Sequence, residues 1–501
     1  MSRPQSLGEL RRSGYRSRSV RDELRQNLLA ALRAGTPRWR GIVGYDQSVL
    51  PQIENALLGR QDFILLGLRG QAKTRLLRQL VELLDPEIPA LDGTPLNDDP
   101  LDPVSTEGRR LVAELGDRAP IRWIPRAERY REKLATPDTT IADLIGDIDP
   151  IKAAARGLSY ADEGAIHYGI IPRTNRGIFA INELPDLQPR IQVGLLNVLE
   201  ERDFQIRGFP VRMPLDIVMV FSANPEDYTN RGNIITPLRD RIAAQILTHY
   251  PKSVEEGMAI TAQEAWTERG DAPHIHVPAF LREAVERTAM EARKSELVNQ
   301  ASGVSARLTI ALLEQMVSNA ERRAVRLRLE RDVARTCDLL ASVSAVSGKV
   351  ELVYEGEREG IEAVAHRLLG LGLKAAFDHY FPDALRQEPT KPSGKKGAGA
   401  PAAPVGMASG PFKPVVDWFG SGNTVELADE MDPREFRAAL DAVPGLEKLT
   451  KQYMSESAGE ELASAMEFTL EGLHQASVLA RSRVEGRTSF RDMVRSMLEG
   501  M

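Results

Sequence analysis

The sequence holds few of the residues that build covalent links or metal centres. Cys337 is the only cysteine in 501 residues, so this chain alone can form neither a disulfide nor a site with several thiolate ligands. Its helical-looking surroundings, VARTCDLLASV, favour a buried and inert thiol. His167 has no second histidine or cysteine at ligand spacing, and we therefore expect no metal site made of protein ligands alone.

Long apolar runs and a secretion signal are also missing. No stretch approaches about 18 uninterrupted apolar residues, and the start of the chain lacks the apolar segment of a signal peptide. We therefore expect a cytoplasmic protein without a membrane span. The Arg and Ser content of residues 1–40 leaves an organellar transit peptide as the alternative. Glu9, Asp22 and Glu23 interrupt that pattern and favour a basic leader followed by an amphipathic helix.

Positive charge is not in excess. The chain has 65 Lys and Arg against 71 Asp and Glu, which gives a formal net charge of -6. A nucleic-acid binder neutralises backbone phosphates with many cations, so this balance argues against broad nucleic-acid binding. The arginine-rich start leaves local binding open.

Composition and periodicity divide the chain into five segments. We expect a basic leader and helix in 1–36, an α/β core in 37–250 that starts to fold near Trp39, and an all-helical domain in 251–383. Residues 384–414 are rich in Pro, Gly, Ala, Ser and Lys without periodicity, which predicts a flexible linker. The last segment, 415–501, predicts a helical C-terminal domain with runs at about 433–443, 459–482 and 488–498.

The core segment predicts a parallel sheet. Apolar, strand-like runs at 62–67, 120–124, 177–182 and 216–224 alternate with helical runs. This alternation is typical of a parallel sheet with helices on both faces.

A phosphate-binding loop is expected between the first strand and the helical run RLLRQLVELL. Backbone N–H groups of such a loop surround the β-phosphate at a helix N-terminus, while its lysine reaches the β and γ phosphates and its threonine ligates Mg²⁺. We therefore assign ATP binding to Gly67, Leu68, Arg69, Gly70, Gln71, Ala72, Lys73, Thr74 and Arg75, with Thr74 on the metal. Ala72 replaces the usual second glycine, and we expect its φ to be negative because its β-carbon is then tolerated.

Polar residues end the last two predicted core strands. The run GIFAIN is followed by Glu183, which we expect to act as the general base that activates water. Asn182 stands where a carboxylate normally holds magnesium, and we assign Asn182 and Glu183 to the surroundings of the metal. Because an amide is neutral, we expect Asn182 to weaken ATP hydrolysis more than ATP binding. Asn224 ends the following strand and could hold the attacking water.

Two arginines precede the change to purely helical sequence. An exposed arginine there can stabilise the γ-phosphate charge of a neighbouring subunit as an arginine finger. We favour Arg241 for this role and place Arg239 second, with two solvated helical arginines as the alternative.

These segments together resemble the AAA+ ATPases, most closely the magnesium chelatase ATPase subunit and the related MoxR-type ATPases. The similarity covers about 38–380 and rests on RGIVGYDQ, GLRGQAKT, TTIADLIGDIDPIKAAARG with YGIIPRTNRGIFAINELPDL, and LLNVLEERDFQIRGFPVRMPLDIVMVFSANP. It implies a hexameric ring with ATP and Mg²⁺ between subunits, a helical lid in 251–383, and Arg307 as second sensor beside Asn224 as first. It also implies a β-hairpin insertion centred on Gly208 that carries Phe204, Ile206, Phe209 and Val211.

The resemblance suggests a chaperone-like motor that remodels a client protein or loads metal into it, together with a von Willebrand A domain partner. The Asp-x-Ser-x-Ser pattern of that domain does not occur in this chain, so such a partner would be a separate protein. The first alternative is a nucleotide-dependent ring scaffold with little hydrolysis, caused by Asn182. The second is a nucleic-acid or transcription-related AAA+ protein, although no Gly-Ala-Phe-Thr-Gly-Ala-like loop occurs.

Overall fold

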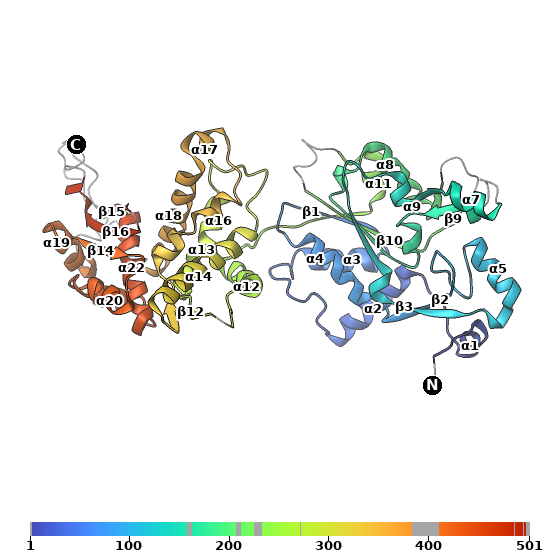
Figure 1. The fold of residues 1–501 in the computed structure, drawn as a ribbon, viewed down its shortest axis with the longest axis horizontal. Coiled ribbons are helices and arrows are strands. Elements are labelled where there is room, and N and C mark those ends of the chain that lie inside the picture. Colours follow the sequence, from blue (N-terminus) through green and yellow to red (C-terminus); the bar gives the residue numbers. More distant parts are fainter. Residues whose placement is uncertain are drawn as a thin grey trace. The chain divides into compact units, whose positions relative to one another are not determined.

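The computed structural model describes residues 3–157, 163–206, 212–224, 233–270, 272–382, 410–484, 486–493 and 495–496. The chain divides into two compact units, Met1–Tyr250 and Pro251–Met501 (Figure 1). In the described part of the chain, no helix has the length and apolar character that a membrane span requires. The same residues contain no cluster of three or more His, Cys, Asp or Glu side chains placed to hold a metal ion.

A five-stranded parallel sheet forms the centre of the first unit and confirms the predicted fold class. Its strand order is β11-β1-β10-β7-β4, with β1 at Phe63–Leu66, β4 at Tyr130–Leu134, β7 at Gly177–Asn182, β10 at Ile217–Ala223 and β11 at Ala244–Leu247. Every residue of β7 and β10 is buried, as expected of central strands covered on both faces.

One strand prediction needs correction, and two strands of the central sheet were not predicted. The run at 120–124 does not join the central sheet, because β3 (Ile121–Pro125) pairs antiparallel with β2 (Glu87–Leu91) in a separate ribbon. Sequence analysis missed β4 and β11, which form the two edges of the central sheet. Their sequences, YREKL and AQIL, are polar or short because an edge strand needs less apolar surface than a central one.

The N-terminal segment belongs to the folded unit, so the prediction that folding starts near Trp39 is wrong. Helix α1 (Leu7–Arg12) packs near Ala119, and α2 (Val20–Ala34) packs against α3 (Val49–Leu58). Leu24 and Leu28 of α2 are fully buried in the core that also contains β1. A leader would not bury such side chains.

The remaining elements of the first unit surround the sheet. They are α4 (Lys73–Gln79), α5 (Thr106–Leu115), α6 (Ile141–Leu144), β5 (Gly146–Ile148), α7 (Pro150–Arg156), β6 (Ile166–Tyr168), α8 (Pro189–Gly194), α9 (Leu196–Glu200), β8 (Asp203–Gln205), β9 (Arg212–Pro214) and α11 (Thr236–Arg241). Strands β8 and β9 pair antiparallel at the predicted insertion, with Phe204 and Ile206 buried. Gly208, Phe209 and Val211 lie outside the described residues.

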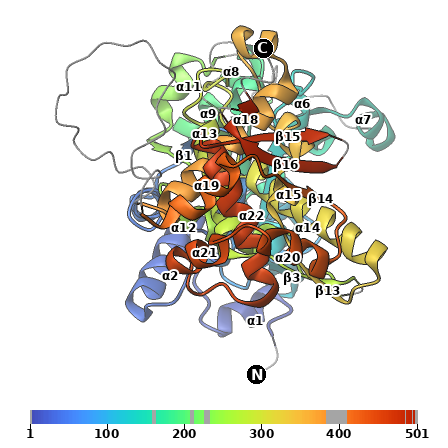
Figure 2. The ribbon, with the colours of Figure 1, turned by 90° about the vertical axis from the view of Figure 1, so that its left-hand side faces the viewer.

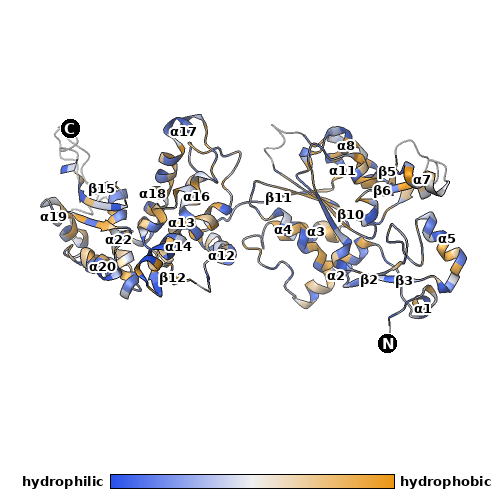
Figure 3. Cartoon of the chain, viewed as in Figure 1, coloured by the Kyte–Doolittle hydropathy of each residue, from blue (hydrophilic) through white to orange (hydrophobic). Residues whose placement is uncertain are grey.

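The second unit is mainly helical (Figures 1 and 3). Its helices are α12 (Val254–Glu264), α13 (Ala279–Ala292), α14 (Arg307–Leu327), α15 (Thr336–Leu340), α16 (Val343–Ser347), α17 (Tyr354–Glu359), α18 (Ile361–Tyr380), α19 (Lys413–Gly420), α20 (Pro433–Asp441), α21 (Leu446–Tyr453) and α22 (Gly459–Gln475). Phe468 of α22 contacts Phe280 of α13 with a tilted ring and Phe377 of α18 with an edge-on ring, in one core that these three helices share. The segments expected as two domains, 251–383 and 415–501, thus share a hydrophobic core.

Short strands complete this unit. Strands β12 (His274–His276) and β13 (Arg331–Val333) pair parallel, whereas β14 (Val425–Ala428), β16 (Arg487–Asp492) and β15 (Leu479–Val484) form an antiparallel sheet (Figure 2). The helical run predicted at 459–482 is therefore wrong beyond Gln475, and the run predicted at 488–498 is wrong as far as Asp492, where β16 ends. Gly486 has a φ of 74° between β15 and β16, a conformation that favours a turn and ends helical periodicity.

Candidate nucleotide-binding site

The predicted nucleotide residues lie where three neighbouring parallel strands end. Gly67 follows β1, Glu183 follows β7, and Asn224 follows β10. Because β10 lies between β1 and β7 and all three run parallel, their carboxyl ends meet at one edge of the sheet. Helix α4 begins at Lys73, so its first residues face the same edge.

Lys73 is the central cation of this site. Its side chain is 7% exposed, and Nζ donates hydrogen bonds to the Leu68 carbonyl oxygen at 3.0 Å and to Asn224 Oδ1 at 2.6 Å. A third hydrogen bond goes to the Gly67 carbonyl oxygen. The ammonium is thus held inside the loop by neutral oxygens, the position that a phosphate-binding lysine requires.

Asn224 connects Lys73 to Glu183. Its Nδ2 donates to Glu183 Oε2 at 2.9 Å, while its Oδ1 accepts from Lys73. Both contacts require the same orientation of the amide, because the ammonium only donates and the carboxylate only accepts. Lys73, Asn224 and Glu183 therefore form one continuous chain of hydrogen bonds.

Asn182 is turned toward a neighbouring strand. Its Oδ1 accepts a hydrogen bond from Ser222 Oγ at 3.0 Å, and the residue is 8% exposed. The Glu183 N–H lies 3.4 Å from the same hydroxyl, and Glu183 has a left-handed φ of 56°. Ser222, which sequence analysis missed, thus fixes the bend that directs Glu183 away from the strand.

Ala72 contradicts its sequence-based prediction. Its φ is 57°, in the left-handed region, instead of negative. A residue with a β-carbon costs about 1 kcal/mol there relative to glycine. The loop therefore keeps the backbone conformation that a glycine usually supplies.

Side chains from outside the loop hold this conformation. The Tyr45 hydroxyl lies 2.7 Å from the His249 carbonyl oxygen and 3.0 Å from that of Gln71, and its single proton is shared between these two acceptors. Thr248 Oγ1 donates to Gln71 Oε1 at 2.6 Å. Tyr250 adds a hydrogen bond from its hydroxyl to the Arg69 carbonyl oxygen at 3.0 Å. Burial raises the pKa of Tyr45 to about 12, so its hydroxyl stays protonated as a donor at neutral pH.

The same packing explains Gly67. A β-carbon at this position would lie 1.9 Å from Thr248 Oγ1 and 2.1 Å from Gln71 Oε1, far below contact distance. Sequence analysis missed Tyr45, Thr248 and Tyr250 as loop supports, because only the fold brings them to the loop. Thr74 is half-buried in the first turn of α4, and Arg75 is exposed there.

The predicted arginines lie in different surroundings. Arg241 ends α11 and pairs with Glu200, with Nε 2.6 Å from Oε2, and it also donates to the Pro237 carbonyl oxygen at 3.0 Å. Arg239 is exposed and has no ion pair with another described residue. Arg307 is the first residue of α14 in the second unit and is exposed.

Taken together, these residues fit a nucleoside triphosphate with Mg²⁺. The loop requires glycine at 67, surrounds a buried ammonium and leads into a helix whose second residue is a threonine. Glu183 supplies a carboxylate on the neighbouring strand end, joined to the lysine through Asn224. Such a set can bind phosphates, ligate magnesium and orient a water molecule.

Comparison with known proteins finds subunits of magnesium chelatase among the matches. The chain is 26% identical over 275 residues to magnesium-chelatase subunit ChlI of Nostoc sp. strain PCC 7120, which covers 54% of this chain and 69% of that subunit. It is 28% identical over 236 residues to the magnesium-chelatase 38 kDa subunit of Cereibacter sphaeroides, covering 46% of this chain and 64% of that subunit. No protein-family model matches the chain.

Among solved structures, a complex between magnesium chelatase subunits BchI and BchD matches with a TM-score of 0.33 and 21% identity, covering 64% of this chain and 98% of that chain. The sequence relatives confirm the predicted resemblance to the magnesium chelatase ATPase subunit and, with it, the prediction of an AAA+ ATPase. The matches span about two thirds of the length of these subunits.

Proposed function

We propose that this chain is the ATP-hydrolysing subunit of a homo-oligomeric, hexameric ring, in which ATP and Mg²⁺ occupy the loop that Lys73 closes. The observation that carries the proposal is the hydrogen-bonded chain of Lys73, Asn224 and Glu183. This chain connects the phosphate-binding lysine, the polar side chain proposed to hold the attacking water and the proposed general base at one edge of the sheet.

Each residue has a separate task in this proposal. Lys73 exchanges its contacts with the loop carbonyls for phosphate oxygens, and the Thr74 hydroxyl ligates the metal. Glu183 takes the proton of the attacking water, which Asn224 holds in position. When bound, Mg²⁺ neutralises phosphate charge and favours displacement of the γ-phosphoryl group.

A ring places an arginine of one subunit beside the γ-phosphate of its neighbour. Arg241 would have to leave Glu200 to act in this way, whereas Arg239 needs no ion pair to be broken. Both remain candidates for the finger, and Arg307 is the proposed second sensor of the lid. A Glu200→Ala variant should increase activity if Arg241 is the finger.

We further propose that a separate von Willebrand A domain protein works with the ring on a protein client, by remodelling it or loading metal, in the cytoplasm. The second candidate is a ring scaffold with little hydrolysis. Asn182 favours this candidate, because its neutral amide accepts a hydrogen bond from Ser222 at the position where a carboxylate normally holds magnesium. Glu183 is then the carboxylate that follows β7.

Steady-state ATP hydrolysis with Mg²⁺ tests these proposals. The motor proposal expects measurable turnover that is lost in Lys73→Ala and Glu183→Gln, while Lys448→Ala, at an exposed lysine of the second unit, keeps full activity. If the wild type binds ATP without turnover and Asn182→Asp introduces hydrolysis, the scaffold is correct and the motor proposal fails for the isolated protein.

A further inference from the structure

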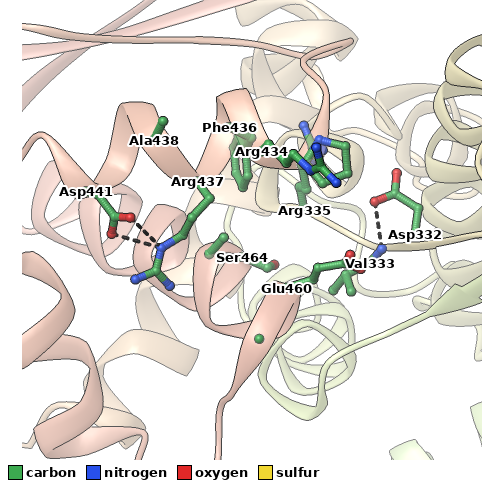
Figure 4. Close-up of a pocket in the computed structure, with 13 residues that line it drawn as sticks. Asp332, Val333, Arg335, Arg434, Phe436, Arg437, Ala438, Asp441, Glu460 and Ser464 are labelled. Atoms are coloured by element: carbon green, nitrogen blue, oxygen red, sulfur yellow. Dashed lines mark hydrogen bonds and ion pairs between the residues drawn. The ribbon is translucent and has the colours of Figure 1, made fainter.

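A cavity of about 470 Å³ opens in the second unit, and none of the residues assigned to ATP lines it (Figure 4). Helices α20 and α22 form its walls together with β13 and Arg335, which follows that strand. Its apolar lining comes from Val333, Pro433, Phe436, Ala438 and Ala463. Its volume lies within the range of about 300–1,000 Å³ that is usual for small-molecule sites.

Arg335 is the unusual member of this lining. The residue is 2% exposed, and its guanidinium carbon lies 4.0 Å from the centre of the Phe436 ring. Its Nη1 is buried without a hydrogen-bond partner, and no ion pair joins the side chain to another residue of the described ranges. Burial and the nearby charge of Arg323 lower the pKa of Arg335. The charge of the buried Glu467 on α22 partly compensates Arg335, but a buried N–H group without a hydrogen-bond acceptor still lowers the stability of the folded protein.

A neighbouring arginine shows what Arg335 lacks. Arg323 is also 2% exposed, but its Nε lies 2.8 Å from Asp332 and its Nη1 lies 2.6 Å from Asp338. Asp332 of β13 and Asp338 of α15 are thus paired with Arg323. The buried Arg335 therefore keeps its hydrogen-bonding capacity beside the cavity.

The remaining charges of the lining limit what can bind. Arg434 is exposed and has no ion pair with another described residue, whereas Arg437 binds Asp441 at 2.8 Å, as the dashed lines in Figure 4 show. Asp332, Asp441 and Glu460 also line the cavity and repel a multiply charged anion. A single negative charge suits this balance better than a phosphate.

From these observations we infer that the cavity binds a small organic carboxylate with an apolar body. The planar guanidinium of Arg335 receives the carboxylate through paired N–H···O hydrogen bonds, and Arg434 adds positive charge at the opening. The apolar wall around Phe436 holds the rest of the ligand. This site is independent of the ATPase proposal, because none of its residues belongs to the nucleotide site.

Calorimetric titration of the full chain with octanoate tests the inference. Saturable binding with a dissociation constant of about 1 mM or lower is expected, together with at least about tenfold weaker binding of octanol, which lacks the charge. Arg335→Met should weaken octanoate binding at least about tenfold. Arg358→Met, at an exposed arginine of α17, serves as the matched control and should bind like the wild type.

A second variant covers the case in which Arg335→Met does not fold. Ala438 is exposed on α20 and lines the cavity, so Ala438→Trp should fill the opening and abolish octanoate binding while α20 stays intact. No saturable binding of octanoate to the wild type overturns the inference. Equal binding of octanol, or binding that survives in Ala438→Trp, overturns it as well.

Discussion

Asn224 Oδ1 lies 2.6 Å from Lys73 Nζ, although 151 positions separate the two residues in the sequence. The amide binds the lysine through its oxygen and Glu183 through its nitrogen, so it determines how the phosphate-binding cation and the base face each other. A side chain in this position should affect the chemical step more than nucleotide affinity.

We therefore expect Asn224→Ala to lower kcat about 100-fold. ATP affinity, measured with a fluorescent analogue, should change less than about threefold, because the loop contacts that position Lys73 before ATP binds do not involve Asn224. Asn423→Ala, on the surface of the second unit, is the matched control. A large loss of affinity with unchanged kcat would show that Asn224 supports the loop and takes no part in catalysis.

Tyr45 offers a test of how the loop is held. Tyr45→Phe removes only the hydroxyl that binds Gln71 and His249, while the ring keeps its edge-on contact with His249 at 4.9 Å between centroids. Loss of these hydrogen bonds should destabilise the loop by about 1–2 kcal/mol, since two buried carbonyls lose a donor. Weaker ATP binding together with faster amide exchange in 67–72 is the expected result. Unchanged exchange would contradict it.

The left-handed backbone of Ala72 predicts that glycine at this position stabilises the protein. At a φ of 57°, Ala72→Gly should raise stability by up to about 1 kcal/mol, seen as a higher thermal midpoint of the first unit. Ala72→Val should lower it, because a branched side chain tolerates this conformation still less. If φ were negative, Ala72→Gly would instead destabilise, so the sign of the change decides the question.

The nucleotide site could be predicted because its motifs are contiguous in the sequence. The loop from Gly67 to Thr74 and the strand ending at Asn182 carry their own local patterns. Their supports do not, since Tyr45 and His249 meet only after 204 positions of intervening chain have folded. The edge strand β4 could not be predicted from the sequence, because its partly exposed residues, YREKL, form no apolar run.

The prediction of a leader in 1–36 was wrong because the segment is held by contacts with residues far away in the sequence. Its arginines suggest a solvated leader, yet Glu23 of α2 receives two hydrogen bonds from Arg129, at 2.7 and 2.6 Å, and both side chains are almost fully buried. Charge patterns cannot show such pairing when the partner lies 106 positions away.

This pair makes a direct prediction. Glu23→Gln or Arg129→Met should each destabilise the first unit by about 3–5 kcal/mol, because the remaining charge is buried without its partner. The double variant Glu23→Leu with Arg129→Met should lose much less than the sum of the two. Denaturant unfolding measures all three. Strictly additive losses would show that the two side chains act independently.

Glu467 predicts a dependence of stability on pH in the second unit. It is buried on α22, where its carboxylate accepts a hydrogen bond from the Thr336 N–H at 2.7 Å. Burial raises its pKa from 4.5 to about 7, an effect that the charge of Arg335 partly opposes and those of Asp338 and Asp429 reinforce. Between these two pKa values the folded state binds more protons than the unfolded state.

Stability should therefore be highest at the acidic end of this window and fall by about 3 kcal/mol as pH rises from 4.5 to 7, if Glu467 acted alone. Glu467→Gln keeps an acceptor for Thr336 and removes the titration. The variant should gain stability over the wild type above pH 7 and show a flatter profile below it. Denaturant unfolding across this range measures the difference, and parallel profiles for the two proteins would assign the pH dependence to other groups.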